Sequence, residues 1–552
     1  MVYSRGLVFF FLFWLTGSLV FIQNSGGYGL SLPQNCFSWA MMGILIFSVS
    51  LSVIRKKQYL VITPALRLFA AGVVILALPL LYTRPEWRLT GGLYWAGAAA
   101  GLLFYLCCVQ LKLNKDQIRF LVLLWLSACM AHALLVLLQL TPAGGWIPWP
   151  VLSNRPYGVF QQVNLLATFL SCGMALALFL FLLPEQRQSG ISRGISVSAL
   201  LIMPCVLVLI QSRIGLLSAV ITAVMLLLSV GTYRRKYSAV ILLAGGVIAG
   251  WWLKNHTQIG VISHLNSDHA RLEMFSSTWE MLKQRPLIGW GAGGFEYVFQ
   301  MFRVLQGKST EGTGVVIHPH NEILFWGAEG GVVALTGLAL IITGGGLIIQ
   351  RAWLAFYRGN NPLPLTLCLT ILPLLLHTQT EYPFGLSALH FALCLLLLSQ
   401  ADRATASPAK TLALPSFFSM IAAGTGAGMI CIMAGAFLTG IILTETEQQG
   451  MQDIRALSSV PEFVLITQYE RVEFDRHVHK LMQFNQTGEP RLLADYRRWA
   501  VNYLKKHTDK NVYISLIMIL HYQGDSEAEK YYLNQAGQLF PQDIRFFSGR
   551  LL

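Results

Sequence analysis

Long apolar runs separated by short polar connections are the main pattern of this chain. Thirteen runs approach the roughly 20 residues that a helix needs to cross a bilayer. They lie at 7–22, 36–54, 66–83, 91–111, 119–140, 163–184, 195–212, 214–230, 238–253, 323–350, 363–378, 385–400 and 415–443. The pattern predicts an all-α polytopic membrane protein with about thirteen transmembrane helices.

The connections between the runs carry a signal of orientation. Lysine and arginine gather in alternate connections, at 55–57, 112–119, 187–193, 234–236, 351–358 and 403–410. Short cytoplasmic loops are enriched in these residues, so this set is predicted to be cytoplasmic. With thirteen spans, the N-terminus then lies in the cytoplasm and the C-terminus lies outside. The same count places the polar stretches 154–164, 211–213, 254–322 and 378–384 on the outer side.

Two longer polar regions suggest how the chain is organised. We expect a transmembrane domain over 1–443 with one large outer loop at 254–322, followed by a small helical domain over 444–552. Residues 512–540 read as an apolar helix, a Gly-Asp turn, a second helix with alanine at core spacing, and a proline. This pattern predicts either a tetratricopeptide-like hairpin or a generic helical hairpin.

Composition agrees with the membrane assignment. The chain has 552 residues, is 55% hydrophobic and 12% charged, and has a mean hydropathy of +0.56. Soluble proteins carry roughly 25% charged residues. The net charge of +14 lies mostly in the short connections, so topology explains it and no nucleic-acid partner is predicted. The nine cysteines lie in or beside apolar runs without CxxC pairs, and indicate neither disulfides nor zinc.

The most informative stretch is 315–331, which reads V-V-I-H-P-H-N-E-I-L-F-W-G-A-E-G-G. His318, His320, Asn321 and Glu322 stand at the mouth of an apolar run, where polar groups are costly unless they have a function. Three roles are open: a metal site, although H-x-H with Glu322 matches no recognised spacing; capping of the helix; or a histidine general base near neutral pH. In the last case Asn321 or Glu322 would orient the imidazole.

Two arginines are candidate anion ligands. Arg213 lies in the tight turn Q-S-R-I-G between two apolar runs. It is either an interfacial anchor or a ligand whose planar fork of donors matches phosphate. Arg271 opens a segment with apolar residues at helical spacing, which predicts a helix on the membrane surface; a solvated charge is the alternative for this arginine. Pro286 should end that helix, and the glycines that follow predict a sharply turning backbone.

Further polar residues enter other runs. Gln161, Gln162 and Asn164 in R-P-Y-G-V-F-Q-Q-V-N-L-L-A precede the sixth run, and helix capping accounts for one of the three. Glu381 in H-T-Q-T-E-Y-P-F-G lies beside His377 and Tyr382. This carboxylate either pairs with an arginine or contacts the substrate.

Together these segments resemble the superfamily of O-antigen ligases and oligosaccharyltransferases, and within it the PglL-type protein O-oligosaccharyltransferases. The resemblance rests on Q-S-R-I-G, on R-L-E-M-F through P-L-I-G-W-G-A-G-G-F, on H-P-H-N-E-I-L and on T-E-Y-P-F-G. In the 156–164 segment, Val159-Phe160 stands between Gly158 and Gln161, where the family usually has a glycine-asparagine-glutamine core. The resemblance implies that His320 is catalytic and that Arg213 and Arg271 bind the lipid pyrophosphate. Supporting roles fall to His318, Asn321, Glu322, Gln161, Gln162, Asn164, Glu381 and Tyr382, and no metal or other cofactor is expected.

The activity implied by the resemblance is transfer of an oligosaccharide from undecaprenyl pyrophosphate to Ser or Thr hydroxyls of periplasmic proteins such as a pilin. The enzyme would lie in the bacterial inner membrane with a periplasmic active site. Alternatives are an O-antigen ligase that acts on lipid A core, an O-antigen polymerase, and a non-enzymatic transporter of an anionic lipid or solute. The T-E-Y-P-F-G segment and the C-terminal domain favour the protein acceptor.

Overall fold

The computed structural model describes residues 2–57, 59–147, 155–183, 189–256, 265–310, 315–359, 361–406, 410–412 and 416–547. Among the positions singled out in the sequence, those outside the described residues include Asn154, 187–188, 407–409, and 257–264 and 311–314 of the predicted outer loop.

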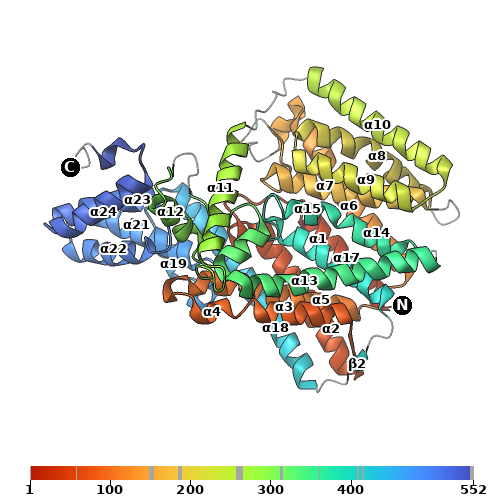
Figure 1. Ribbon diagram of the computed structural model, residues 1–552, viewed down its shortest axis with the longest axis horizontal. Helices are drawn as coiled ribbons and strands as arrows, with labels where there is room; N and C mark the ends of the chain where they lie inside the picture. The colour runs from red at the N-terminus through yellow and green to blue at the C-terminus, as the bar shows by residue number, and fades with distance from the viewer. Residues whose placement is uncertain are drawn as a thin grey trace. The chain divides into compact units, whose positions relative to one another are not determined.

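Helices form almost all of the described structure (Figure 1). In the first half of the chain they are α1 (Val2–Gly17), α2 (Pro33–Lys56), α3 (Pro64–Ile75), α4 (Pro79–Tyr82), α5 (Arg88–Gln110), α6 (Lys115–Gln139), α7 (Val163–Leu182), α8 (Gly190–Ile210), α9 (Arg213–Ser229), α10 (Tyr233–His256) and α11 (Leu265–Gln284). The second half contains α12 (Phe295–Leu305), α13 (Glu322–Gly359), α14 (Leu363–Thr370), α15 (Leu372–His377), α16 (Pro383–Leu386), α17 (Ala388–Thr405), α18 (Ser416–Gln448), α19 (Arg455–Ser458), α20 (Glu462–Leu465), α21 (Tyr469–Thr487), α22 (Pro490–Tyr503), α23 (Lys510–Tyr522) and α24 (Ser526–Leu539).

Many of these helices are long and apolar enough to cross a membrane. Within the described residues, nine helical segments meet that condition by length and composition, and three shorter apolar helices lie at Gly6–Gly17, Arg213–Ser229 and Leu363–His377. Each of the thirteen predicted runs overlaps a helix, and the run at 385–400 is divided between α16 and α17. The chain is therefore an all-α polytopic membrane protein.

In two of the predicted runs a proline breaks the helix. The run at 66–83 is divided between α3 and α4, and the run at 363–378 between α14 and α15. Pro79 and Pro373 stand at the first turns of α4 and α15. A proline has no amide proton and clashes with the carbonyl four residues before it, so the preceding helix ends near that carbonyl. Accordingly α3 ends at Ile75.

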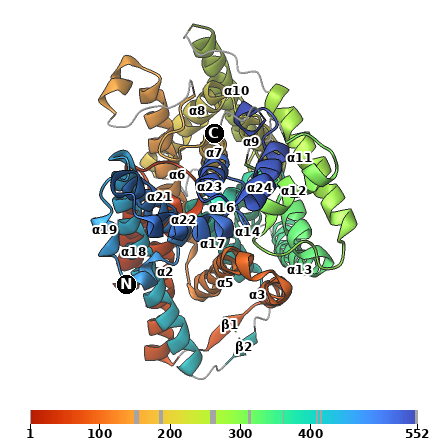
Figure 2. The same ribbon diagram turned by 90° about the vertical axis from the view of Figure 1, so that its left-hand side faces the viewer.

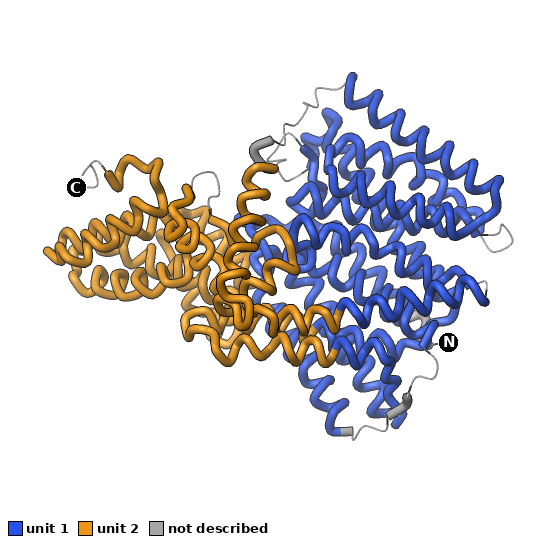
Figure 3. The backbone as a smooth tube through the Cα atoms, viewed as in Figure 1, with its two compact units in different colours: residues 1–69, 101–262, 342–437 blue, residues 70–100, 263–341, 438–552 orange. Residues whose placement is uncertain are grey.

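The chain divides into two compact units (Figure 3). Unit 1 comprises residues 1–69, 101–262 and 342–437. Its most buried helix is α7, in which every residue from Leu165 to Leu180 is buried. Helices α6, α8, α9, α14 and α15 pack against α7 (Figure 1). A helix that is apolar all round is suited to such a fully buried position.

Unit 1 also contains the two strands of the described structure. Strand β1 (Leu60–Ile62) pairs antiparallel with β2 (Lys410–Leu412), with Val61 opposite Thr411 (Figure 2). The sequence pattern did not predict this ribbon, because three residues are too few to show the alternation that marks a strand.

Unit 2 comprises residues 70–100, 263–341 and 438–552. One of its clusters of buried apolar side chains joins α11, α12 and the start of α13; its members include Met274, Met281, Phe295, Phe299, Phe302 and Phe325. A second cluster forms the core of α22, α23 and α24. The predicted boundary between residues 443 and 444 falls within α18, and the division into domains 1–443 and 444–552 stays a prediction.

The predicted C-terminal helical hairpin is confirmed. Helices α23 and α24 pack against each other (Figure 1), and the turn between them contains Gly524, whose φ of +73° suits glycine. The carboxylate of Asp525 accepts a hydrogen bond from the amide of Ala528 at 3.2 Å and caps α24.

Candidate active site

His320 has an unusual backbone conformation just before α13. Its φ of +58° lies in the left-handed region, which non-glycine residues seldom adopt. The amide of His320 donates a hydrogen bond to Nδ1 of His318 at 3.0 Å. His318 is buried, and its ring packs on Phe325 with 4.5 Å between centroids. The side chain of His318 therefore supports the backbone that presents His320.

Asn321 caps α13. Its Oδ1 accepts a hydrogen bond from the amide of Leu324 at 3.0 Å, and its carbonyl accepts one from the amide of Phe325. The helix-capping role thus belongs to Asn321, not to the two histidines. Oε2 of Glu322 lies 3.9 Å from Nε2 of His318, which is too long for a hydrogen bond.

The glycine-rich segment 289–294 packs its backbone against the first part of α13. The amides of Trp290 and Gly291 donate to the carbonyls of Ala328 and Glu329, each at 2.9 Å. A Cβ at Gly289 would lie 2.5 Å from the carbonyl of Glu329, so no larger residue fits there. Gly331 interrupts α13 with φ 60° and ψ −152°. The predicted sharp turns are confirmed, and close backbone packing explains these glycines.

Arg271 lies in the first half of α11, which a buried arginine holds against α12. The guanidinium of Arg303 donates to Glu273 Oε2 at 3.0 Å, to Ser277 Oγ at 3.1 Å and to the carbonyl of Ser309. On the opposite side of α11, three of the four apolar residues at the predicted spacing are exposed. They are Leu272, Phe275 and Trp279, exposed at 67%, 49% and 47%.

A second group of predicted residues meets around Glu381, which is buried. Its Oε1 accepts a hydrogen bond from Nδ2 of Asn164 at 2.8 Å, and its Oε2 accepts one from Nε2 of Gln162 at 2.9 Å. Nε2 of His377 lies 2.9 Å from the same Oε2. The structure therefore brings Glu381 together with Gln162 and Asn164, which lie more than 200 positions earlier in the sequence.

This network is completed by three residues that were not among the predicted site residues: Ser212, Thr168 and His377. Ser212 donates to Oδ1 of Asn164 at 2.8 Å, and Thr168 lies 2.9 Å from Nδ1 of His377. Helical spacing was a usable signal, because Thr168 follows Asn164 by four residues and Glu381 follows His377 by four. Tyr382 directly follows Glu381 and precedes α16.

Arg213 is the first residue of α9, and its side chain is exposed. Ser212 caps this helix, accepting a hydrogen bond from the amide of Gly215 at 3.3 Å. Gln211 before it has a φ of +52°. The guanidinium of Arg155 donates to the carbonyls of Ile210 and Gln211 at 2.8–3.0 Å, which stabilises the turn that presents Arg213.

Strained backbone occurs at two candidate residues, Gln161 and His320, and at Gln211 close to Arg213. Five non-glycine residues of the described chain have positive φ, and three of them are Gln161, Gln211 and His320. Each such conformation costs about 1–3 kcal/mol and persists where the surrounding structure imposes it, often at functional sites.

Family models describe the same segments. A model described as O-antigen ligase matches residues 198–339. A second, described as virulence factor membrane-bound polymerase, C-terminal, matches 365–548, and a third, described as protein glycosylation ligase, matches 156–181. The chain is a PglL-type member of the O-antigen ligase superfamily. A comparison with curated proteins gave no significant match.

Membership makes this PglL-type protein an oligosaccharide ligase or transferase of the membrane. The matched ranges contain every candidate residue. The O-antigen ligase range holds Arg213, Arg271 and His320. The protein glycosylation ligase range holds Gln162 and Asn164. The polymerase range holds Glu381 and its neighbours.

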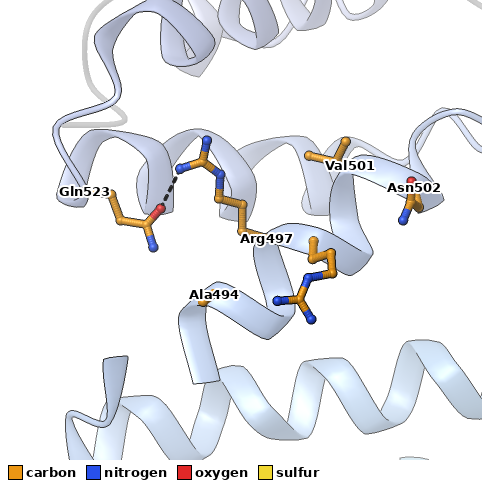
Figure 4. Close-up of a pocket in the computed structure, with 6 residues that line it drawn as sticks. Ala494, Arg497, Val501, Asn502 and Gln523 are labelled. Atoms are coloured by element: carbon orange, nitrogen blue, oxygen red, sulfur yellow. Dashed lines mark hydrogen bonds between the residues drawn. The ribbon is translucent and has the colours of Figure 1, made fainter. Parts of the chain in front are cut away.

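Neither a metal cluster nor a surface depression provides a second site in the described part of this ligase. The described residues contain no group of three or more His, Cys, Asp or Glu side chains placed to hold a metal ion. A surface depression of about 410 Å³ lies on α22 and the end of α23 (Figure 4), lined by Ala494, Arg497, Arg498, Val501, Asn502 and Gln523. Arg497 donates to Gln523 at 2.8 Å and to Asp525 at 2.5 Å, so these contacts explain its position.

Proposed function

We propose that this ligase transfers an oligosaccharide from undecaprenyl pyrophosphate to Ser or Thr hydroxyls of periplasmic proteins. The observation that carries the proposal is the strained segment at His320, held by His318 and capped by Asn321, within the range that matches the O-antigen ligase model. We further propose that the enzyme lies in the bacterial inner membrane with this segment on the periplasmic side.

His320 acts as the general base. An imidazole with its ordinary pKa of about 6.5 accepts a proton readily near neutral pH. The acceptor hydroxyl gives its proton to His320 while its oxygen forms a bond to the anomeric carbon of the glycan. The bond from that carbon to the pyrophosphate oxygen breaks, and undecaprenyl pyrophosphate leaves with the bonding electrons. General base catalysis of this kind typically contributes 10²–10⁴-fold.

Arg213 and Arg271 bind the lipid pyrophosphate. Negative charge grows on the pyrophosphate as it leaves, so cations placed there stabilise the transition state more than the ground state. Guanidinium suits this role because its forked donors match two phosphate oxygens at once. The turn held by Arg155 and Ser212 supports this assignment for Arg213.

A protein acceptor is favoured by the match of residues 156–181 to the protein glycosylation ligase model. A pilin is an example of such an acceptor. The second candidate is polymerase activity, in which another lipid-linked glycan accepts the sugar; the polymerase model that matches 365–548 supports it. O-antigen ligation to lipid A core is the third choice of acceptor.

Mass spectrometry of periplasmic proteins from cells with and without this chain tests the acceptor class. We expect glycan on Ser or Thr residues that disappears when the chain is removed. Unchanged protein glycosylation together with shortened lipid-linked polysaccharide would favour the polymerase. Transport of the lipid-linked glycan across vesicles without bond formation would contradict a transferase.

A further inference from the structure

His377 and Thr168 form a buried hydrogen-bonded pair behind Glu381 in unit 1. Both side chains are fully buried, and Thr168 Oγ1 lies 2.9 Å from Nδ1 of His377. Nε2 of the same ring lies 2.9 Å from Oε2 of Glu381. Buried polar groups are costly unless they are hydrogen-bonded, and here both ring nitrogens have partners.

Thr168 forms a hydrogen bond with Nδ1 of His377 in either arrangement of their protons. Thr168 has a single hydroxyl proton and two groups within 2.9 Å, the carbonyl of Asn164 and Nδ1 of His377. If the hydroxyl donates to the carbonyl, Nδ1 must carry a proton and donate to Oγ1. If the hydroxyl donates to Nδ1, the ring proton lies on Nε2 and points to Glu381. In the second arrangement, rotation of the imidazole breaks both hydrogen bonds. In the first it breaks the bond to Thr168, and also the bond to Glu381 where Nε2 or the carboxyl carries a further proton.

The fixed ring in turn fixes the carboxylate of Glu381. Its oxygens accept from Gln162 and Asn164, so the amide of Asn164 can present only its oxygen to Ser212. Ser212 is the N-cap of α9, and Arg213 is the next residue. A continuous chain of polar contacts therefore connects the buried Thr168 on α7 with Ser212, the N-cap of α9.

We propose that His377, held by Thr168, is a positioning residue that fixes Glu381 and, through Asn164 and Ser212, the start of α9 where Arg213 binds the lipid pyrophosphate. The inference rests on the proposed function of Arg213. It assigns His377 no contact with the substrate.

Thr168→Val tests the inference because it keeps the shape of the side chain and removes the hydroxyl. The probe is undecaprenyl pyrophosphate without glycan, titrated onto the full-length protein in detergent. We expect its Kd to rise about 10-fold, kcat/KM for the lipid-linked donor to fall by a similar factor, and KM for the acceptor to stay unchanged. Thr168→Ser restores the hydroxyl and should return both values to those of the unsubstituted protein.

Thr370→Val is the matched control. Thr370 is also fully buried in a helix, and its hydroxyl donates only to the carbonyl four residues earlier, at 2.9 Å from Thr366 O. Both valine variants lose that local bond, but only Thr168→Val removes the partner of His377. Glu381→Gln provides a second variant. The glutamine side chain has nearly the same shape as glutamate, but its amide changes the hydrogen bonding to Nε2 of His377. We expect the same rise in the Kd of the probe.

The outcomes separate this inference from the proposed function. If the unsubstituted protein binds and transfers, but Thr168→Val and Glu381→Gln bind the probe equally well, His377 is not a positioning residue. An equal loss in Thr370→Val would also overturn the inference. If the unsubstituted protein binds the probe and Thr168→Val weakens binding, but no glycan is transferred, the proposed function fails and the positioning role stands. No binding to the unsubstituted protein contradicts both.

Discussion

Single side chains determine how His320 is presented. The imidazole of His318 accepts a hydrogen bond from the amide of His320, and Asn321 caps the helix that follows. A positive φ at His320 is therefore maintained by its two neighbours in the H-x-H-N sequence. This arrangement gives each residue of that short motif a separate physical role.

Replacing His318 by phenylalanine should misplace His320. The new ring keeps the packing on Phe325 but leaves the amide of His320 without its acceptor, at a cost of about 1–3 kcal/mol of stability. Small displacements of catalytic groups reduce rates by up to about 10²-fold, so we expect a 10–100-fold loss of kcat in a transfer assay. His318→Asn retains an acceptor oxygen and should recover part of the rate. Full activity in the phenylalanine variant would contradict the role of His318 in supporting the backbone of His320.

A buried carboxyl on α21 gives a prediction about pH. Burial, together with nearby Glu447, raises the pKa of Asp475 to about 7 against the opposing effect of Arg471. Because the folded-state pKa lies above the unfolded value, the stabilisation from the neutral acid is present below about pH 4 and is lost as the pH rises through 7.

Asp475→Asn removes this titration. Apparent unfolding temperatures of the full-length protein, measured from pH 4.5 to 8, should show the variant increasingly more stable than the unsubstituted protein toward pH 8. A constant difference across this range would contradict a raised pKa.

The residue types of the site could be predicted from the sequence, but their pairing could not. Gln162, Asn164 and Glu381 stood out because amides and carboxylates entering apolar runs are costly. Nothing in local spacing indicated that Asn164 would bond Glu381 across 217 positions. Thr168 and Ser212 were missed because small hydroxyl residues are common in membrane helices and give no separate signal.

At the scale of elements, the C-terminal helices hold the loop helix α12. Nδ1 of His507 lies 3.0 Å from Glu296, the second residue of α12, and Nε2 lies 3.3 Å from Glu470 on α21. Trp87 donates to the carbonyl of Lys505 at 3.0 Å. Thr310 donates to the carbonyl of Leu539 at 2.7 Å. The same α12 packs against Phe325, so these helices support the segment that carries His320.

This attachment should weaken at alkaline pH. Burial lowers the pKa of His507, but the carboxylates of Glu296 and Glu470 outweigh it and raise the pKa to about 9. Lys506 pairs with the same Glu470, and the ring of Tyr503 packs on the imidazole with 4.5 Å between centroids. The raised pKa means that the stabilisation is fully present below about pH 6.5 and is lost as the pH rises through 9.

Thermal unfolding between pH 6 and 10 checks this prediction. We expect the unsubstituted protein to lose stability through pH 9, and His507→Gln to start lower and change less. His521→Gln on the exposed face of α23 is the control and should follow the unsubstituted protein. Equal pH profiles for all three would contradict the role of His507.

The sequence predicted most elements because spanning helices are long and apolar. The interruptions at Pro79 and Pro373 follow from proline itself, although the runs at 66–83 and 363–378 were expected to be continuous. The β1–β2 ribbon depends on pairing between distant residues such as Val61 and Thr411, and three-residue strands carry no periodic signal.

At the scale of the whole molecule, the predicted topology places the C-terminal helices outside the cell membrane. Lys530 on α24 and Arg234 on α10 are exposed, and Cys431 is the exposed cysteine of the described chain. In a Cys431→Ser background, Lys530→Cys should react with an impermeant maleimide in spheroplasts, whereas Arg234→Cys should react only after lysis. The opposite pattern would reverse the predicted orientation.

Transfer of glycan by the purified protein tests the central claim most directly. The full-length protein is mixed with an undecaprenyl-pyrophosphate-linked oligosaccharide and a Ser/Thr-containing acceptor protein, and the intact mass of the acceptor is measured. We expect the mass of one glycan to appear on the acceptor, and the rate to fall at least 10²-fold in His320→Ala while His521→Ala transfers normally. An acceptor of unchanged mass, or full transfer by His320→Ala, would contradict the proposed reaction or its base.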